Sequence, residues 1–526
     1  MEFRFCFPTF SDLGFYLSNF YYFFKNSYYT TDVFLINVQN SYVAIYPEMY
    51  LILTISLLIG FLVVLDYKYN YKFILSAIAG KILIVLFFLT LILLQTLNAD
   101  FFVFNDLLEV DNFAIFIKSI ILISSILCIY MSFSYIKYEK IVQYEYFLLL
   151  GLAVLGMFTL ASCNDLITLY IGIEIQSLCF YVLATFKVYN NFSTEAGLKY
   201  FVLGAFSSGV LLFGSSFIYG SLGTTNFSEM GLLYSEGFEN LETPKSLILG
   251  IIFVIIAIFF KLGAAPFHMW LPDVYEGVPT IVTAIYSIVP KIALFGLFIR
   301  FNFNLLTANK FFIEDILLYG AILSIIIGTL GALYQTKLKR LLAYSAISHV
   351  GFLLIAFASF NTWSIFSLTF YLVVYILISL NIFSVLLVLR KIDNNLKIKK
   401  INELVILFKS NPLLAINFCF ILFSIAGIPP LMGFYSKLYV FISAIKSEIY
   451  LIAIIAAIFS VIASMYYIRL IKLMFFKNFE YWTLFHEVSK VESLLISTTL
   501  FLNLLFFCYP EVFIVSIYNI ILNLFF

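Results

Sequence analysis

The chain has 526 residues, of which 63% are hydrophobic and 11% charged, and its formal net charge is +1. A mean hydropathy of +1.05 excludes a soluble globular domain, because too little polar side chain is available to face water. Apolar runs recur along the whole sequence and no alternating strand pattern competes with them, so the composition predicts an all-α polytopic membrane protein.

Fourteen apolar runs are each long enough to cross a hydrocarbon core of roughly 30 Å as a helix. The predicted spans start near residues 50, 73, 112, 145, 164, 195, 246, 279, 314, 341, 364, 411, 450 and 491. Residues 1–46 form an aromatic extension to which we assign no function. It lacks the pattern of a cleaved transit peptide, and the many Phe (63) and Tyr (37) residues suggest an A/T-rich organellar genome.

Charged loop residues support this count, because positive charge gathers on the side from which helices are inserted. Loops after odd-numbered spans are basic, with Lys68, Lys72, Lys137, Lys140, Lys187, Lys337, Lys339, Arg340, Lys391, Lys397, Lys399, Lys400, Lys472 and Lys477. Loops after spans two and six are acidic. Two exceptions are the loop after span seven, with Asp273 and Glu276, and the loop after span eight, with Arg300 and Lys310.

Prolines interrupt spans seven and twelve in similar contexts, A-A-P-F-H-M-W at Pro266 and A-G-I-P-P-L-M-G-F at Pro429 and Pro430. These two spans are five apart, and a shift of five helices reverses orientation in the membrane. We therefore predict inverted repeats, spans 4–8 and 9–13, with broken helices 7 and 12 near a transport site. Carbonyl groups freed at such a break can hold water or an ion.

Several titratable residues lie within apolar sequence, where a charge costs roughly 2.5–3.5 kcal/mol at the bilayer centre. Glu174 lies in the middle of span five and is the most plausible counter-ion of Lys261, which lies beside the first break. Movement of Glu174 would change whether Lys261 holds its proton. Lys199, near the start of span six, either joins these residues or extends to the interface.

Further basic residues extend this set along the midplane. Lys291 follows Pro290 in span eight, and Lys437 follows the second break, in the position that corresponds to Lys261. His268 either relays protons or caps the broken helix. Ser348 and His349 in span ten either bridge the row or belong to the core. Two other lysines in apolar runs are expected to extend to the interface instead, Lys81 and Lys118.

No cofactor site is expected in this chain. The cysteines are scattered without metal-ligand spacing, the three histidines are far apart, and no Gly-rich nucleotide loop is present. We therefore expect no bound metal and no redox chemistry in the chain itself.

Five motifs resemble subunit 2 of respiratory complex I, the mitochondrial counterpart of bacterial subunit N. They are N-D-L-I-T-L-Y-I-G-I-E-I-Q-S-L, E-A-G-L-K-Y-F-V-L-G-A, F-F-K-L-G-A-A-P-F-H-M-W-L-P-D-V-Y-E-G-V-P-T, L-K-R-L-L-A-Y-S-A-I-S-H-V-G-F and A-G-I-P-P-L-M-G-F-Y-S-K. The resemblance runs from about Pro47 to the C-terminus. The extension before Pro47 is a departure from the family, whose animal members lack the first three spans.

This resemblance implies a fourteen-helix antiporter-like fold and a proton channel driven by quinone reduction elsewhere in the complex. It assigns Glu174 to modulate Lys261, places Lys437 at the exit pathway, and continues the connecting row through Lys199, His268 and Lys291. It also implies other membrane-arm subunits of complex I and lipids as partners, and no nucleic acid. The chain would then be part of an enzyme, NADH:ubiquinone reductase, without redox chemistry of its own.

The expected division of the chain is an extension (1–46), three helices (47–140), repeat 1 (141–305), repeat 2 (306–480) and a C-terminal helix (481–526). The expected location is the inner mitochondrial membrane, with both termini on the intermembrane-space side. Two other functions stay open: a subunit of a multisubunit sodium/proton antiporter, which shares the fold, and a structural membrane subunit that does not conduct.

Overall fold

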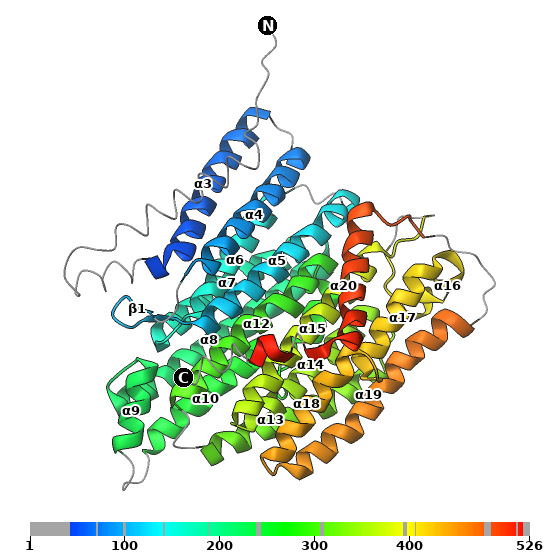
Figure 1. Cartoon of the computed structure of the whole chain (residues 1–526). Coiled ribbons are helices and arrows are strands. Elements are labelled where there is room, and N and C mark those ends of the chain that lie inside the picture. Colours follow the sequence, from blue (N-terminus) through cyan, green and yellow to red (C-terminus); the bar gives the residue numbers. More distant parts are fainter. Residues whose placement is uncertain are drawn as a thin grey trace.

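The computed structural model describes residues 43–69, 72–97, 101–139, 143–187, 189–237, 244–305, 310–392, 397–405, 407–477, 485–511 and 514–518. These residues form a bundle of long helices that lie side by side (Figure 1). Almost the whole predicted extension, residues 1–46, lies outside the described residues, as do both ends of the chain.

Each predicted span coincides with a helix, or with a pair of half-helices, that begins within four residues of the predicted start. The spans are α3 (Tyr46–Tyr69), α4 (Lys72–Gln95), α5 (Asn112–Glu139), α6 (Glu145–Ala161), α7 (Leu166–Ala184), α8 (Asn191–Leu222), α10 and α11 (Lys245–Leu262, Trp270–Gly277), α12 (Thr280–Leu305), α13 (Lys310–Leu333), α14 (Leu338–Ala358), α15 (Thr362–Val388), α17 and α18 (Pro412–Ala426, Met432–Lys446), α19 (Tyr450–Phe476) and α20 (Lys490–Cys508). Within the described residues, 11 helices are long and apolar enough to cross a membrane, and α6 and α17 are shorter apolar helices. The predicted all-α polytopic fold is confirmed.

The loops contain the remaining elements. They are the short helices α9 (Phe227–Gly237), η1 (Ile401–Leu404) and α16 (Leu407–Ser410), and an antiparallel hairpin of β1 (Phe101–Val103) and β2 (Leu108–Val110). This hairpin in the acidic loop after span two was not predicted, because strands of three residues are too short to show an alternating pattern.

A close contact between two helices recurs in both repeats. A Cβ atom on Gly156 of α6 would lie 2.8 Å from the backbone nitrogen of Gln176 in α7. A Cβ atom on Gly328 of α13 would lie 2.6 Å from the backbone nitrogen of Ser348 in α14. Both pairs of residues are related by the same separation of 172 positions. Only glycine permits either approach, so equivalent helix pairs pack in the same way in both repeats.

Both predicted breaks are present, and both begin at a glycine. Gly263 ends α10 with a φ of 74°, and Gly427 ends α17 with a φ of 85°. These left-handed conformations close the half-helices and turn the chain away. The prolines at positions 266, 429 and 430 follow in the connecting segments, where no helical N–H is required.

Ion pairs explain the two exceptions to the charge pattern. Glu276 pairs with Lys337 and Arg340, which lie in the basic loop after span nine. Arg300 pairs with the carboxylates of Glu109 and Asp111, from the acidic loop after span two. In each case the exceptional charge is neutralised by a partner that belongs to its own side of the membrane.

Lys118 does not extend to the interface, and that prediction was wrong. It is 1% exposed and forms an ion pair with Glu48, which is 6% exposed and lies at the start of α3. Its ammonium also lies 5.9 Å from the centre of the Phe158 ring. The carboxylate supplied by the first span makes burial possible, and no pattern within the third span could indicate it.

Candidate functional site

Lys261 lies in the last turn of α10, directly before the first break. Its Nζ atom donates a hydrogen bond of 3.2 Å to the hydroxyl of Tyr181 on α7. It also lines a cavity of about 20 Å³ together with Tyr200, Trp270 and Tyr286. About 10–15 Å³ suffices for one water molecule, so Lys261 can exchange a proton with a hydroxyl or with water.

Glu174 lies on α7 near Lys261 but does not form the predicted ion pair with it. No nitrogen–oxygen contact within 4.0 Å joins the two side chains in the described structure, although their charges interact. The Oε1 atom of Glu174 is buried and has no hydrogen-bond partner among the described residues. The carboxylate therefore lies near Lys261 without a direct contact to it.

Lys291 lies inside α12 and is 3% exposed. Its Nζ atom donates a hydrogen bond of 2.9 Å to the hydroxyl of Tyr375 on α15 and lies 4.7 Å from the centre of that ring. The partner of this lysine is thus a neutral hydroxyl and not a carboxylate.

His349 lies on α14. The charged side chains close enough to interact with its ring are Lys437 and Lys291. Its Nδ1 atom is 2.7 Å from the hydroxyl of Tyr371, and its Nε2 atom is 3.5 Å from the hydroxyl of Tyr467. The ring therefore has hydroxyl neighbours on two other helices, α15 and α19, and does not lie in a purely apolar core.

Lys437 on α18 caps the C-terminal end of α17, the other half-helix of the second break. Its Nζ atom donates to the carbonyl oxygens of Ile425 (3.0 Å) and Ala426 (2.8 Å), the last two residues of α17. These carbonyl groups carry the negative end of the helix dipole and have no partner within the helix. At the first break, a neutral donor bonds near the helix end: the indole Nε1 of Trp270 donates to the carbonyl oxygen of Phe260 (2.9 Å), two residues before the end of α10.

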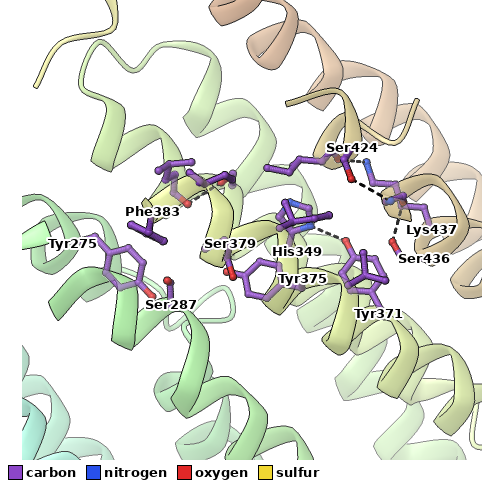
Figure 2. Close-up of a pocket in the computed structure, with 18 residues that line it drawn as sticks. Tyr275, Ser287, His349, Tyr371, Tyr375, Ser379, Phe383, Ser424, Ser436 and Lys437 are labelled. Carbon is purple, nitrogen blue, oxygen red and sulfur yellow. Dashed lines mark hydrogen bonds between the residues drawn. The ribbon is translucent and has the colours of Figure 1, made fainter. Parts of the chain in front are cut away.

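A second cavity, of about 40 Å³, joins His349 to Lys437. Figure 2 shows Tyr275 and Ser287 at one end of this cavity and Lys437 at the other, with His349 between them. Its volume has room for two or three water molecules, and hydroxyl groups line it along its length. Protons can therefore be held and passed between basic groups here.

Five of the predicted residues line neither cavity: Glu174 and Lys291, described above, and Lys199, His268 and Ser348. Lys199 is on the outside of the bundle, with its side chain 45% exposed and paired with Glu195 (2.8 Å) and Asp273 (3.4 Å). His268 is buried at the first break, and its Nδ1 atom has no partner among the described residues. Ser348 is buried but donates to the carbonyl oxygen of Ser345 within its own helix (2.7 Å).

The sequence-based prediction missed the tyrosines that hold the row. Tyr371 and Tyr375 are four residues apart in span eleven, and Ser379 follows after another four, so all three share one helix face. This spacing was a usable signal, but tyrosine is so frequent in the chain that it did not stand out. Within the described residues, no group of three or more His, Cys, Asp or Glu side chains is placed to hold a metal ion.

Comparison with known proteins identifies the family. Residues 163–463, more than half of the chain, match the model of the NADH:quinone oxidoreductase/Mrp antiporter transmembrane family. NADH-ubiquinone oxidoreductase chain 2 of Marchantia polymorpha is 40% identical over 481 residues, which cover 90% of this chain and 96% of the relative. The chain belongs to the NADH-ubiquinone oxidoreductase chain 2 family.

Bacterial and structural relatives of the chain 2 family agree with this assignment. NADH-quinone oxidoreductase subunit N of Paramagnetospirillum magneticum is 41% identical over 374 residues, 71% of this chain and 76% of the relative. A chain of Thermus thermophilus respiratory complex I, solved with bound aureothin, has a TM-score of 0.73 and 26% identity, and the match covers 89% of this chain and 98% of that one. The resemblance inferred from the five sequence motifs is confirmed.

Proposed function

We propose that this chain is a membrane-arm subunit of NADH:ubiquinone oxidoreductase that moves protons across the inner mitochondrial membrane. Quinone reduction elsewhere in the complex drives this movement. The observation that carries the proposal is a set of basic residues inside the bundle with a cavity at Lys261 and another between His349 and Lys437. Lys291 and Lys437 are buried, and Lys261 and His349 are partly buried.

The partners of these residues support proton movement over a purely structural role. Lys261 and Lys291 bond to tyrosine hydroxyls, and Lys437 bonds to backbone carbonyls. A structural lysine within a membrane is expected to pair with a carboxylate, as Lys118 does. Neutral partners instead leave each amine free to gain and lose a proton without breaking an ion pair.

The remaining site residues are assigned roles at the edges of the row. Glu174 modulates Lys261 through its charge, and His268 carries protons past the first break, where its Nδ1 atom is buried and has no hydrogen-bond partner among the described residues. Lys199 belongs to the outer surface, where Glu195 and Asp273 hold it. Ser348 supports the position of His349 on α14.

The orientation and organisation follow from the charge pattern and the repeats. Basic loops on one side place both termini on the other, which is the intermembrane space. Residues 141–305 and 306–480 form the two repeats, after the three helices of residues 47–140 and before the last helix in 481–526. Other complex I subunits and lipids cover the exposed apolar faces of the bundle.

A sodium/proton antiporter subunit is the nearest alternative, since the matched family model includes Mrp antiporters.

We expect the chain to migrate in an NADH-oxidising band when gently solubilised membranes are separated on a native gel and the band is analysed by mass spectrometry. The reason is that the relative covering 90% of the chain is an oxidoreductase subunit. Migration in a smaller assembly without NADH oxidation would favour the antiporter, and sodium-dependent proton exchange would then be measured.

Glu174→Gln is expected to lower proton-coupled turnover by ~5-fold or more, the lower end of typical coupling between sites. The substitution removes the charge that acts on Lys261 and breaks no hydrogen bond of Oε1. Proton uptake per NADH oxidised, measured in vesicles, tests it. Glu229→Gln, an exposed carboxylate on α9, is the matched control. Equal proton uptake in both variants would remove Glu174 from the mechanism.

A further inference from the structure

Lys291 forms a hydrogen bond to a side chain that lines the larger cavity, that of Tyr375. The cavity that contains His349 and Lys437 is lined by Ser287 and Tyr375 but not by Lys291. The smaller cavity, with Lys261, is lined by Pro290 and Leu294 but not by Lys291 either. Lys291 therefore lines neither cavity, although residues close to it on α12 line each of them.

Tyr375 lines the larger cavity, and its hydroxyl is the hydrogen-bond partner of Lys291. It accepts the hydrogen bond of Lys291 on one side (2.9 Å). On the other side, the Tyr375 ring borders the cavity beside His349, with 5.4 Å between the two ring centres. Among the hydrogen bonds of the described residues, this is the only side-chain contact of Lys291.

Polar side chains from three helices help to line the cavity beside Tyr375. Polar residues four positions apart line it on α14 (Ser345 and His349) and on α15 (Tyr371, Tyr375 and Ser379), and Ser287 contributes from α12 one turn before Lys291. Residues at this spacing lie on one face of a helix. Figure 2 shows Tyr375 and Ser379 next to His349 along the cavity.

We propose that Tyr375 is the proton relay between Lys291 and the cavity that contains His349 and Lys437. This inference rests on the proposed function. In the step, an N–H bond of the Lys291 ammonium breaks and an O–H bond forms at Tyr375, while the original O–H bond of Tyr375 breaks and its proton passes to water in the cavity. Lys291 becomes a neutral amine, and Tyr375 stays neutral because a hydroxyl both accepts and donates.

The test is Tyr375→Phe in the assembled complex, reconstituted in lipid vesicles with a pH-sensitive dye. Phenylalanine keeps the ring beside Lys291 and removes only the hydroxyl. We expect proton-pumping turnover per assembled complex to fall at least ~10-fold. This is a smaller factor than the ~10²–10⁴-fold that a positioned proton-transfer group typically contributes to a rate. We also expect a larger solvent deuterium isotope effect on turnover, since proton transfer becomes slower than the other steps.

Tyr146→Phe is the matched control, because the hydroxyl of Tyr146 is buried and has no hydrogen-bond partner among the described residues. Tyr375→Gln separates relaying from positioning: its amide can hold Lys291 by a hydrogen bond but does not relay a proton readily. We expect it to be as slow as Tyr375→Phe. Full turnover in Tyr375→Gln would show positioning alone and overturn the relay.

Lys291→Met separates this inference from the proposed function. If Lys291→Met stops pumping and Tyr375→Phe pumps like Tyr146→Phe, the relay is wrong and the proton row remains. If Lys291→Met also pumps like the control, the proposed function itself fails.

Discussion

Lys261→Met is expected to stop proton translocation through this subunit, with a loss of ~10²-fold or more, while the complex still assembles. Methionine keeps much of the length and apolar volume of the lysine side chain but cannot hold a proton. The native partner is one tyrosine hydroxyl at 3.2 Å, and no carboxylate forms an ion pair with Lys261 in the described structure, so the substitution breaks no ion pair. Proton uptake per NADH oxidised in vesicles measures the loss, and a native gel measures assembly.

Lys81→Met is the matched control for this experiment. Lys81 also lies within an apolar span, α4, but its side chain is exposed on the surface of the bundle. We expect Lys81→Met to pump normally. If Lys261→Met pumped as well as Lys81→Met in an assembled complex, the chain would be a structural subunit that does not conduct.

Lys118→Met is expected to have the largest effect on stability, about 3–5 kcal/mol, which is typical when one partner of a buried ion pair is removed. The change leaves the Glu48 carboxylate 6% exposed and without its cation. One oxygen of this carboxylate, Oε2, already has no hydrogen-bond partner among the described residues. We expect the start of α3 to lose its contact with Lys118 on α5, and the midpoint of thermal disassembly of the detergent-solubilised complex to fall.

The double variant Glu48→Gln with Lys118→Met decides whether the ion pair causes this loss. With both charges removed, no uncompensated charge remains in the membrane, and we expect most of the stability to return. A double variant as unstable as Lys118→Met alone would mean that the volume and packing of Lys118, and not its charge, hold α3 in place.

The architecture could be predicted from the sequence because it depends on patterns that are local in the chain. Apolar run length sets each span, and glycine with proline sets each break. Loop charge then checks the number of spans, and even its exceptions, Glu276 and Arg300, have partners on the expected side. The hairpin of β1 and β2 escaped prediction because three residues per strand carry too little pattern.

The candidate site could be predicted only in part, because its contacts join residues far apart in the sequence. Lys261, Lys291 and Lys437 are conspicuous as charges in apolar runs. Their partners are not, since a tyrosine on another helix looks like any apolar aromatic residue. Lys199 and Lys118 show the same limit: whether a lysine is exposed or buried depends on what the neighbouring helices supply, Asp273 in one case and Glu48 in the other.

The different caps at the two breaks make the repeats chemically unequal. The indole of Trp270 cannot release its proton under physiological conditions, so its hydrogen bond near the end of α10 does not depend on protonation. The end of α17 is capped by Lys437, an ammonium that can lose its proton. Any event that separates α18 from α17 must change the hold of Lys437 on its proton, and by reciprocity any proton leaving Lys437 must loosen that joint. The contact between α17 and α18 thus depends on the protonation of Lys437, whereas the contact of Trp270 with Phe260 involves no titratable side chain.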